Sequence, residues 1–383
     1  MRLSVIIVSY QAAAELELCL WAACQAVEQM DAEIIVIDNA SADPSIQALA
    51  NNFSQLNPPI QKLSWIWNTT NKGFGAACNQ AAAQATGEYL LFLNPDTLIE
   101  PEGLKQALAF LQMQPQAGAL GPYLLNGRGR FLKESRRGFP TPWNSLCKIL
   151  GLAGIFPRSR LLAGYYAGNM PVSYPQPTAV LCGACMLIPR NAWEAIRGFD
   201  ETFFLYGEDT DLCLRLHQKG YLCYFFPDWK VLHLKYRSMR NHPKQHRYYF
   251  FQSMKIYVHK HFPHHQWYLL PAIAWLYRIS RFSRKFQYTT HQKHASSPKT
   301  ALFITCHTHI SSSPIFGDRS VEIRPVNALH EFCLSHLEQN TSSIIILNIQ
   351  DFPIADCFNF LQNMPQAMTL CFLTPYTQSI ICV

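Results

Sequence analysis

The sequence predicts an α/β protein whose mostly parallel, nucleotide-binding sheet is flanked by helices. Short, continuously apolar runs alternate with helical stretches over residues 1–124, and such alternation is typical of parallel strands that are covered on both faces. Because ligands bind at the carboxyl ends of the strands in such sheets, polar residues at these ends predict a nucleotide-like site. Three apolar runs end in this way, at Ser9-Tyr10, Asp38-Asn39 and Asn94-Pro95-Asp96.

Each element of this first half follows from its apolar spacing. Continuous apolar runs predict strands over Leu3–Val8, Glu33–Ile37, Leu63–Trp67 and Tyr89–Leu93. Helical spacing predicts helices over Ala12–Gln29, Ser45–Phe53, Gly75–Ala85 and Pro101–Gln112. The last of these begins with a proline, which is favoured in the first turn of a helix.

In residues 125–262 the sequence predicts a second half that has more loops than residues 1–124. Residues 125–175 are basic and rich in proline and glycine, which favours loops with short helices. The expected strands that follow are Thr178–Pro189, Tyr221–Phe226 and Lys230–Leu234, and the expected helices are Asn191–Ile196, Asp209–Lys219 and Arg247–Phe262.

The remaining residues predict a connecting segment and a small α/β unit of unknown role. Residues 263–299 hold a short apolar stretch, a basic tail and a polar linker. Residues 300–383 then predict a small βαβαβ unit, with strands at Ala301–Thr305, Ile344–Ile349 and Thr369–Leu373 and helices at Val326–Leu337 and Ala355–Gln362.

Charge is unevenly spread along the chain. Residues 1–124 have a net charge of −7, residues 125–300 of +18 and residues 301–383 of −4. A basic middle between acidic ends favours contact with phosphates or lipid head groups, although a solvated basic face remains an alternative.

Signals for export or membrane crossing are not recognisable in the sequence. The first apolar run is too short for a signal peptide, and no run approaches the roughly 20 residues of a spanning helix. Thirteen cysteines without a signal peptide favour free thiols and a cytoplasmic chain.

Two carboxylates stand where chemistry could occur. Asp96 ends a buried strand, where a carboxylate can bind a Mg²⁺ or Mn²⁺ ion that also holds phosphates; the alternative is a turn residue that caps the next helix. Asp209 lies in Glu208-Asp209-Thr210-Asp211, where it could accept a proton from an attacking hydroxyl. The helix dipole alone would also explain acidic residues at such a position.

Six motifs taken together resemble the family 2 inverting glycosyltransferases, and within them the rhamnosyltransferase-like branch. The resemblance covers about residues 1–260 and rests on SVIIVSY, DNAS, NKGFGAACNQ, LNPDT, CGACMLIPR and GFDETFFLYGEDTDLCLRL. It implies a GT-A fold over 1–262, in which residues 1–124 bind the nucleotide and residues 125–262 bind the acceptor.

The resemblance also implies roles for individual residues. Donor-binding positions would be Ser9, Tyr10, Asp38, Asn71, Gly73 and Asn94. Asp96 would bind a divalent metal, Mg²⁺ or Mn²⁺, on the diphosphate, and His233 would complete the metal site. Asp209 would be the catalytic base, with Glu208 beside it. The first aspartate of the usual DXD motif is replaced by Asn94, which leaves the metal fewer carboxylates.

The implied activity is sugar transfer from a nucleoside diphosphate donor, with rhamnose as one candidate sugar, to a glycan or lipid-linked acceptor in cell-surface polysaccharide synthesis. No nucleic acid partner is expected. The segment Trp267–Tyr277 has aromatic residues at both ends, which suits a helix on the inner membrane face or a buried helix. A nucleotidyltransferase and a non-catalytic nucleotide-sugar scaffold are the alternative functions.

Overall fold

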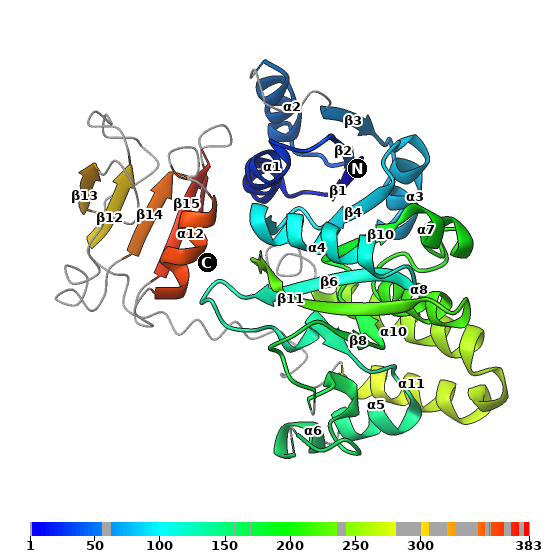
Figure 1. Cartoon of the computed structure of the whole chain (residues 1–383). Coiled ribbons are helices and arrows are strands. Elements are labelled where there is room, and N and C mark those ends of the chain that lie inside the picture. The colour runs from blue at the N-terminus through cyan, green and yellow to red at the C-terminus, as the bar shows by residue number, and fades with distance from the viewer. Residues whose placement is uncertain are drawn as a thin grey trace.

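The structure is a computed structural model that contains two α/β units. It describes residues 2–55, 63–149, 151–156, 158–168, 170–235, 243–280, 300–305, 320–325, 344–348, 352, 354–363, 369–374 and 379–382. A nine-stranded sheet organises the first unit, and a five-stranded sheet organises the second. Figure 1 shows the second unit beside helix α1 (Ala13–Val27) of the first.

The first half of the chain alternates strands and helices as the sequence predicts. Its further elements are β1 (Leu3–Ser9), β2 (Ala32–Asp38), α2 (Ser45–Gln55), β3 (Leu63–Trp67), α3 (Phe74–Gln84), β4 (Tyr89–Leu93), β5 (Thr97–Ile99), α4 (Pro101–Met113) and β6 (Ala117–Leu125). Strands β5 and β6 were not predicted. The first has only three residues, and the second contains Gly118, Gly121 and Pro122, which are unfavourable in strands.

The order of strands in the large sheet is β3-β2-β1-β4-β10-β6-β11-β5, where β10 is Cys185–Pro189 and β11 is Leu222–His233, and β8 (Gln176–Thr178) pairs with β11. Strands β1, β2, β3 and β4 are mutually parallel, and Ser9 lies opposite Asp38 in the register. The carboxyl ends of these strands therefore meet at one edge, and the predicted α/β fold with a mostly parallel sheet flanked by helices is confirmed.

Two predicted boundaries in the second half were wrong. The range Thr178–Pro189 is not one strand, because residues 182–184 separate β9 from β10, and β11 is a single strand with an irregularity after Phe226. The regular elements here are β7 (Arg136–Arg137), α5 (Pro142–Ile149), α6 (Leu152–Ile155), β8 (Gln176–Thr178), β9 (Val180–Leu181), β10 (Cys185–Pro189), α7 (Arg190–Ile196), α8 (Glu208–Gln218), β11 (Leu222–His233), α10 (Pro243–His261) and α11 (Gln266–Ser280). Short 3₁₀ turns occur at Lys133–Ser135, Gly164–Tyr166 and Pro263–His265.

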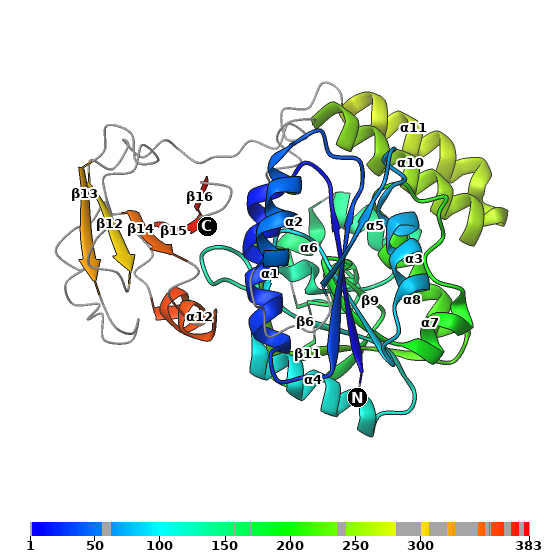
Figure 2. The ribbon, with the colours of Figure 1, turned by 90° about the horizontal axis from the view of Figure 1, so that it is seen from above.

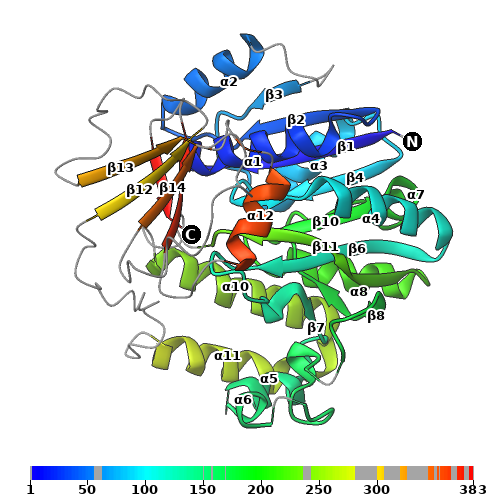
Figure 3. The same ribbon diagram turned by 60° about the vertical axis from the view of Figure 1, so that its left-hand side comes forward.

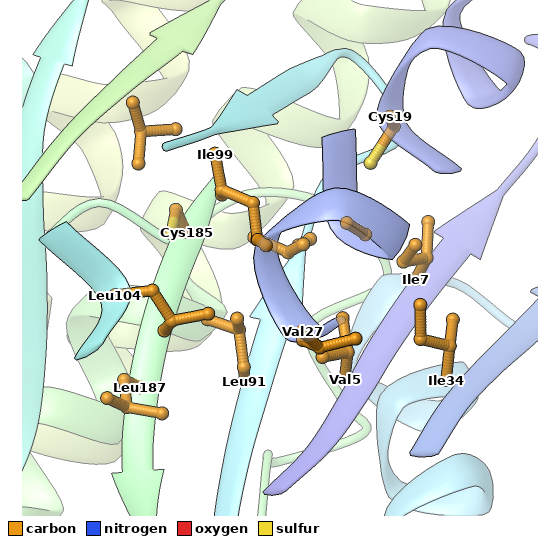
Figure 4. Packing of buried hydrophobic residues seen from close by; sticks show 14 of the residues in the cluster. Val5, Ile7, Cys19, Val27, Ile34, Leu91, Ile99, Leu104, Cys185 and Leu187 are labelled. Carbon is orange, nitrogen blue, oxygen red and sulfur yellow. The ribbon is translucent and has the colours of Figure 1, made fainter. Parts of the chain in front are cut away.

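The core lies on both faces of the large sheet because successive side chains of a strand point in opposite directions. Val5 and Ile7 of β1 pack in one apolar cluster, which Figure 4 shows, whereas Ile6 and Val8 pack in another. Helices α1, α2 and α4 cover the first face, and α3, α7 and α8 cover the second (Figure 2). Burial of these side chains supplies most of the driving force for folding.

The C-terminal unit has more strands than the sequence predicts. Its elements are β12 (Thr300–Thr305), β13 (Ser320–Pro325), β14 (Ile344–Asn348), α12 (Ile354–Asn363), β15 (Thr369–Thr374) and β16 (Ser379–Cys382). The predicted helix at 326–337 and the part of the predicted linker at 281–299 lie outside the described residues. Nine of the described cysteines are free thiols, but Cys371 is disulfide-bonded, which corrects the expectation of thiols only.

The C-terminal unit packs against the first unit through a shared apolar cluster. Leu18 of α1, Leu98 of β5 and Leu232 of β11 are buried in it together with apolar residues of the second unit, such as Phe352 and Phe372. The backbone N–H of Ile354 also donates to Gln25 Oε1 of α1 at 2.8 Å. This contact covers the side of β5 and β11 that the main core leaves open.

Two leucines of α1 allow this contact to be tested. Leu16 packs in the main core and Leu18 in the shared cluster, and both are fully buried. Each change to alanine is expected to cost about 2–5 kcal/mol. We expect Leu18→Ala to accelerate amide hydrogen exchange in β14 and β15 more than in β1 and β2, and Leu16→Ala to do the reverse. Identical exchange patterns in the two variants would contradict the described contact.

Candidate active site

The predicted donor-binding residues gather at the carboxyl edge of the sheet. Ser9 and Asp38 are buried at the ends of neighbouring strands, and Tyr10 follows with 43% of its surface exposed. Asp38 Oδ2 accepts a hydrogen bond from the Ser41 backbone, whereas Ser9 Oγ and Asp38 Oδ1 are buried without a partner among the described residues. Buried polar atoms without partners at this edge are suited to a polar ligand.

Asn39 is the centre of a hydrogen-bond network behind this edge. The side-chain Nδ2 of Asn39 donates to Asn71 Oδ1 at 2.9 Å and to the Gly73 carbonyl at 3.2 Å. The side-chain Oδ1 of Asn39 accepts from the Asn68 side chain and from the Lys72 backbone N–H. Asn71 in turn accepts from the Gly73 backbone N–H. Asn39 therefore fixes the loop that contains the predicted donor residues Asn71 and Gly73.

The same loop contacts the segment that leads to α8. Gly73 has a φ of +85°, and a Cβ there would lie 2.6 Å from the Phe204 carbonyl oxygen, so only glycine fits. Asn79 of α3 donates to the Phe199 carbonyl and accepts from the Phe199 backbone, both at 2.9 Å. The donor edge and the start of α8 are thus held together by backbone contacts.

The two predicted metal ligands lie side by side. Asp96 is in the turn between β4 and β5, and His233 ends β11, which pairs with β5. His233 Nε2 lies 3.4 Å from Asp96 Oδ1. Burial alone would raise the pKa of Asp96, but the attraction and hydrogen bond of His233 and the charge of Lys235 hold this pKa below its usual range.

This pair fits a divalent cation. Neighbouring ligands of a six-coordinate Mg²⁺ or Mn²⁺ lie about 3 Å apart, and carboxylate and imidazole are suitable donors for Mn²⁺. His233 Nδ1 is buried without a hydrogen-bond partner in the described part of the chain. The described residues contain no group of three or more such ligands, so the remaining ligands would be diphosphate oxygens and water.

The predicted base is held by an arginine and by a backbone N–H. Asp209 Oδ2 lies 2.5 Å from Arg137 Nη2 and accepts from the Gly183 N–H at 3.1 Å. Its other oxygen accepts from Thr210. A Cβ on Gly183 would lie 3.2 Å from Asp209 Cβ, so a glycine allows the close approach. This approach explains why the predicted strand Thr178–Pro189 is interrupted here.

The surroundings of Glu208 favour its protonated form. Burial, and secondarily the neighbouring Asp209 carboxylate, raises the pKa of Glu208 to about 8. Glu208 Oε2 is buried and has no hydrogen-bond partner among the described residues. At pH 7 Glu208 is therefore mostly protonated.

One loop connects the predicted base with the predicted metal turn. Gly183 donates to Asp209, and the carbonyl of the next residue, Ala184, accepts from the Asn94 backbone N–H at 2.8 Å. Asn94 begins the turn that contains Asp96. The structure therefore brings Asn94, Asp96, Asp209 and His233 to the same end of the sheet.

Sequence reasoning missed Arg137 and Asn39 as site residues. Arg137 is partly buried beside Asp209 and Tyr165; burial alone would lower its pKa, but attraction to Asp209 raises it above the usual range. The pair Arg136-Arg137 within the basic middle was the available signal. Asn39 was noted only as a strand-end residue, and nothing in the sequence indicates its network.

The raised pKa of Glu208 predicts how stability depends on pH. In the folded chain this pKa is about 8, against an ordinary value of 4.5, so between these pH values the folded state keeps a proton that the unfolded state releases. Stability due to Glu208 is therefore present below pH 4.5 and is lost as the pH rises toward 8. We expect Glu208→Gln to raise Tm by a margin that grows from pH 5 to pH 8, in thermal melts. The exposed Glu88→Gln is the control, and a pH-independent margin for Glu208→Gln would contradict the prediction.

Comparison with known proteins identifies the family. The model of glycosyl transferase family 2 matches residues 4–196, which is half of the chain, and that of glycosyl transferase family group 2 matches residues 160–308. The N-acetylglucosaminyl-diphospho-decaprenol L-rhamnosyltransferase of Mycobacterium tuberculosis is 29% identical over 255 residues, covering 64% of this chain and 80% of that protein. The rhamnosyltransferase WbbL of Escherichia coli is 26% identical over 180 residues, covering 44% and 63%.

Solved structures resemble the chain more distantly. The mannosyltransferase PcManGT of Pyrobaculum calidifontis has a TM-score of 0.47 and 18% identity, and S. aureus TarS 1–349 has a TM-score of 0.44 and 18% identity. Each comparison covers 67% of this chain and 64% of the solved chain, which is less than two thirds of the latter. The sequence matches alone carry the assignment: this chain belongs to glycosyl transferase family 2.

Proposed function

We propose that the chain transfers a sugar, with inversion, from a nucleoside diphosphate donor to a hydroxyl of a glycan or lipid-linked acceptor. The observation that carries this proposal is the loop at Gly183-Ala184, which hydrogen-bonds to Asp209 on one side and to Asn94 on the other. A base for the acceptor and a turn that binds the diphosphate would then both be hydrogen-bonded to one short loop.

The donor would bind along the carboxyl edge of the sheet. Ser9, Tyr10 and Asp38 would contact the nucleotide, and Asn71 and Gly73 would lie near the sugar. Asp96 and His233 would hold a divalent cation, which neutralises the charge that builds up on the leaving diphosphate. Lys235, whose pKa is lowered chiefly by burial, lies close enough to Asp96 to add positive charge.

Asp209 would take the proton of the attacking hydroxyl. The acceptor oxygen then forms a bond to the anomeric carbon while the bond from that carbon to the diphosphate breaks. The nucleoside diphosphate leaves, and Asp209 keeps the proton. Because the attack and the departure occur on opposite faces in one step, the configuration inverts, and no covalent enzyme intermediate is needed.

The names of the relatives favour particular substrates. The Mycobacterium tuberculosis relative is named for L-rhamnose transfer to a decaprenyl diphosphate glycolipid, and the Escherichia coli relative is also a rhamnosyltransferase. We therefore propose rhamnose as the first donor sugar to test and a polyprenyl diphosphate glycan as the first acceptor.

The role of Asp209 is tested by two neighbouring variants. Asp209→Asn is expected to lower the rate of transfer by about 10²–10⁴-fold, the usual contribution of a general base, with donor binding retained. Glu208→Gln is the matched control and should remain within about tenfold of the original rate, because a protonated glutamic acid and glutamine have the same shape. The measurement is release of free nucleoside diphosphate, with donor affinity from calorimetry. Full activity of Asp209→Asn would refute the assignment.

The metal site is tested through His233. We expect His233→Ala to raise the Mn²⁺ concentration needed for half-maximal activity by about tenfold or more, because one of two protein ligands is lost. His217, which hydrogen-bonds to the Thr178 and Ala179 carbonyls away from Asp96, provides the control variant His217→Ala. An unchanged Mn²⁺ requirement in His233→Ala would remove His233 from the metal site.

The alternative functions give different products in the same assay. With the same nucleotide-sugar donor and added pyrophosphate, a nucleotidyltransferase would form a nucleoside triphosphate and a sugar 1-phosphate in place of a nucleoside diphosphate. A non-catalytic scaffold would bind the donor without forming any of these products. Both alternatives are therefore separated from glycosyl transfer by identifying the released phosphate compound.

A further inference from the structure

Two segments that contain none of the predicted site residues carry most of the large apolar side chains that the described residues expose. Eleven of the sixteen such side chains belong to residues 142–161 and 243–280, which contain α5, α6, α10 and α11. Figures 1 and 3 both place α5, α6 and α11 at the lower end of the molecule. We call this surface the aromatic end, and its most apolar exposed members are Trp143, Leu146, Ile155, Phe156, Leu161, Trp267, Trp275 and Ile279.

Helix α11 is apolar on both of its faces. One face packs on α10 through Leu269, Ile273 and Leu276. The opposite face exposes Trp267 (76%) and Trp275 (63%). A helix that is apolar all round is normally covered on all sides, yet nothing among the described residues covers this second face. An exposed apolar surface of this kind marks a site of interaction.

The charges of the aromatic end are of one sign. Residues 142–161 and 243–280 contain eight lysines and arginines and no aspartate or glutamate. Five of these cations are exposed, namely Arg158, Arg160, Lys244, Lys260 and Arg278, and of these Lys260 pairs with Asp200 and Asp211. Tryptophan and tyrosine favour the head-group level of a bilayer, and each lysine or arginine near an anionic leaflet adds attraction. This combination is complementary to an anionic lipid surface.

The length of α11 indicates whether this helix could cross a bilayer or only lie on its surface. The helix has 15 residues with Pro271 inside, whereas a crossing needs about 20. Within the described residues, every helix is too short or too polar for a membrane crossing. We propose that the aromatic end docks on the surface of an anionic lipid bilayer, with the tryptophans at head-group depth.

Both parts of the aromatic end are connected to the first turn of α8. Lys148 of α5 lies 3.7 Å from the centre of the Tyr165 ring, and Tyr165 interacts with Arg137, the partner of Asp209. On the other side, His261 of α10 lies 2.7 Å from the fully buried Asp211. Docking would therefore hold Asp209 at a fixed distance from the lipid. This last step rests on the proposed function, whereas docking itself does not.

Vesicle flotation of the full chain tests the proposal. The probes are vesicles of phosphatidylcholine alone and of phosphatidylcholine with phosphatidylglycerol. We expect strong binding to the anionic vesicles, weak binding to the neutral ones, and weaker binding in high salt. The double variant Trp267→Ala/Trp275→Ala should bind about tenfold or more weakly, and Arg158→Gln should bind about fivefold more weakly. Met113→Ala, 72% exposed on α4 outside the two segments, is the control.

Three results would overturn the proposal. One is a folded chain that does not float with anionic vesicles at low salt. Another is a double tryptophan variant that binds the anionic vesicles as strongly as the original chain does. The third is a dimer in analytical ultracentrifugation that the double variant dissociates, since a second copy would then cover the aromatic end. Donor hydrolysis in the absence of lipid should be the same in the original chain and the double variant, so failure of docking and failure of the proposed function are distinguishable.

Discussion

The arrangement of the active site depends on the close contact between the backbone of Gly183 and the side chain of Asp209. Because Gly183 has no side chain, its N–H reaches Asp209 Oδ2 at 3.1 Å. The contact interrupts the run between β9 and β10, so the next carbonyl is turned toward Asn94. The parallel half of the sheet and the helix α8 are thereby joined at the point where the donor and the acceptor would meet.

Charged side chains from both the acidic first half and the basic middle of the chain lie at this junction. The acidic first half supplies Asp38 and Asp96, and the basic middle supplies Arg137 and Lys235. Arg137 and Asp209 are both partly buried, so the loss of either partner would leave the other with a charge that is largely removed from water and has lost its ion pair. Asp211, two residues further along α8, is also paired with cations: burial would raise its pKa, but His261, Lys260 and Arg215 lower it to about 2.

The sequence was sufficient for the parallel half of the fold and for the motifs at strand ends, because apolar runs and polar ends are local signals. It was insufficient where a distant contact decides the backbone. The interruption at Gly183 depends on Asp209, and strand β6 forms despite its glycines because Gly121 packs against Leu181. Arg137 and Asn39 were missed for the same reason, since their partners are separated from them in the sequence by 72 and by about 30 residues. The site roles of the predicted residues stay predictions.

Two adjacent residues of strand β11 contact the C-terminal unit and the predicted metal site, respectively. Leu232 is buried in the cluster shared with the C-terminal unit, and the next residue, His233, points to the opposite face and lies beside Asp96. A shift of β11 that loosens one of these contacts therefore displaces the other. If the two contacts are coupled, reciprocity requires that a ligand bound at His233 and the attachment of the C-terminal unit strengthen each other by the same free energy.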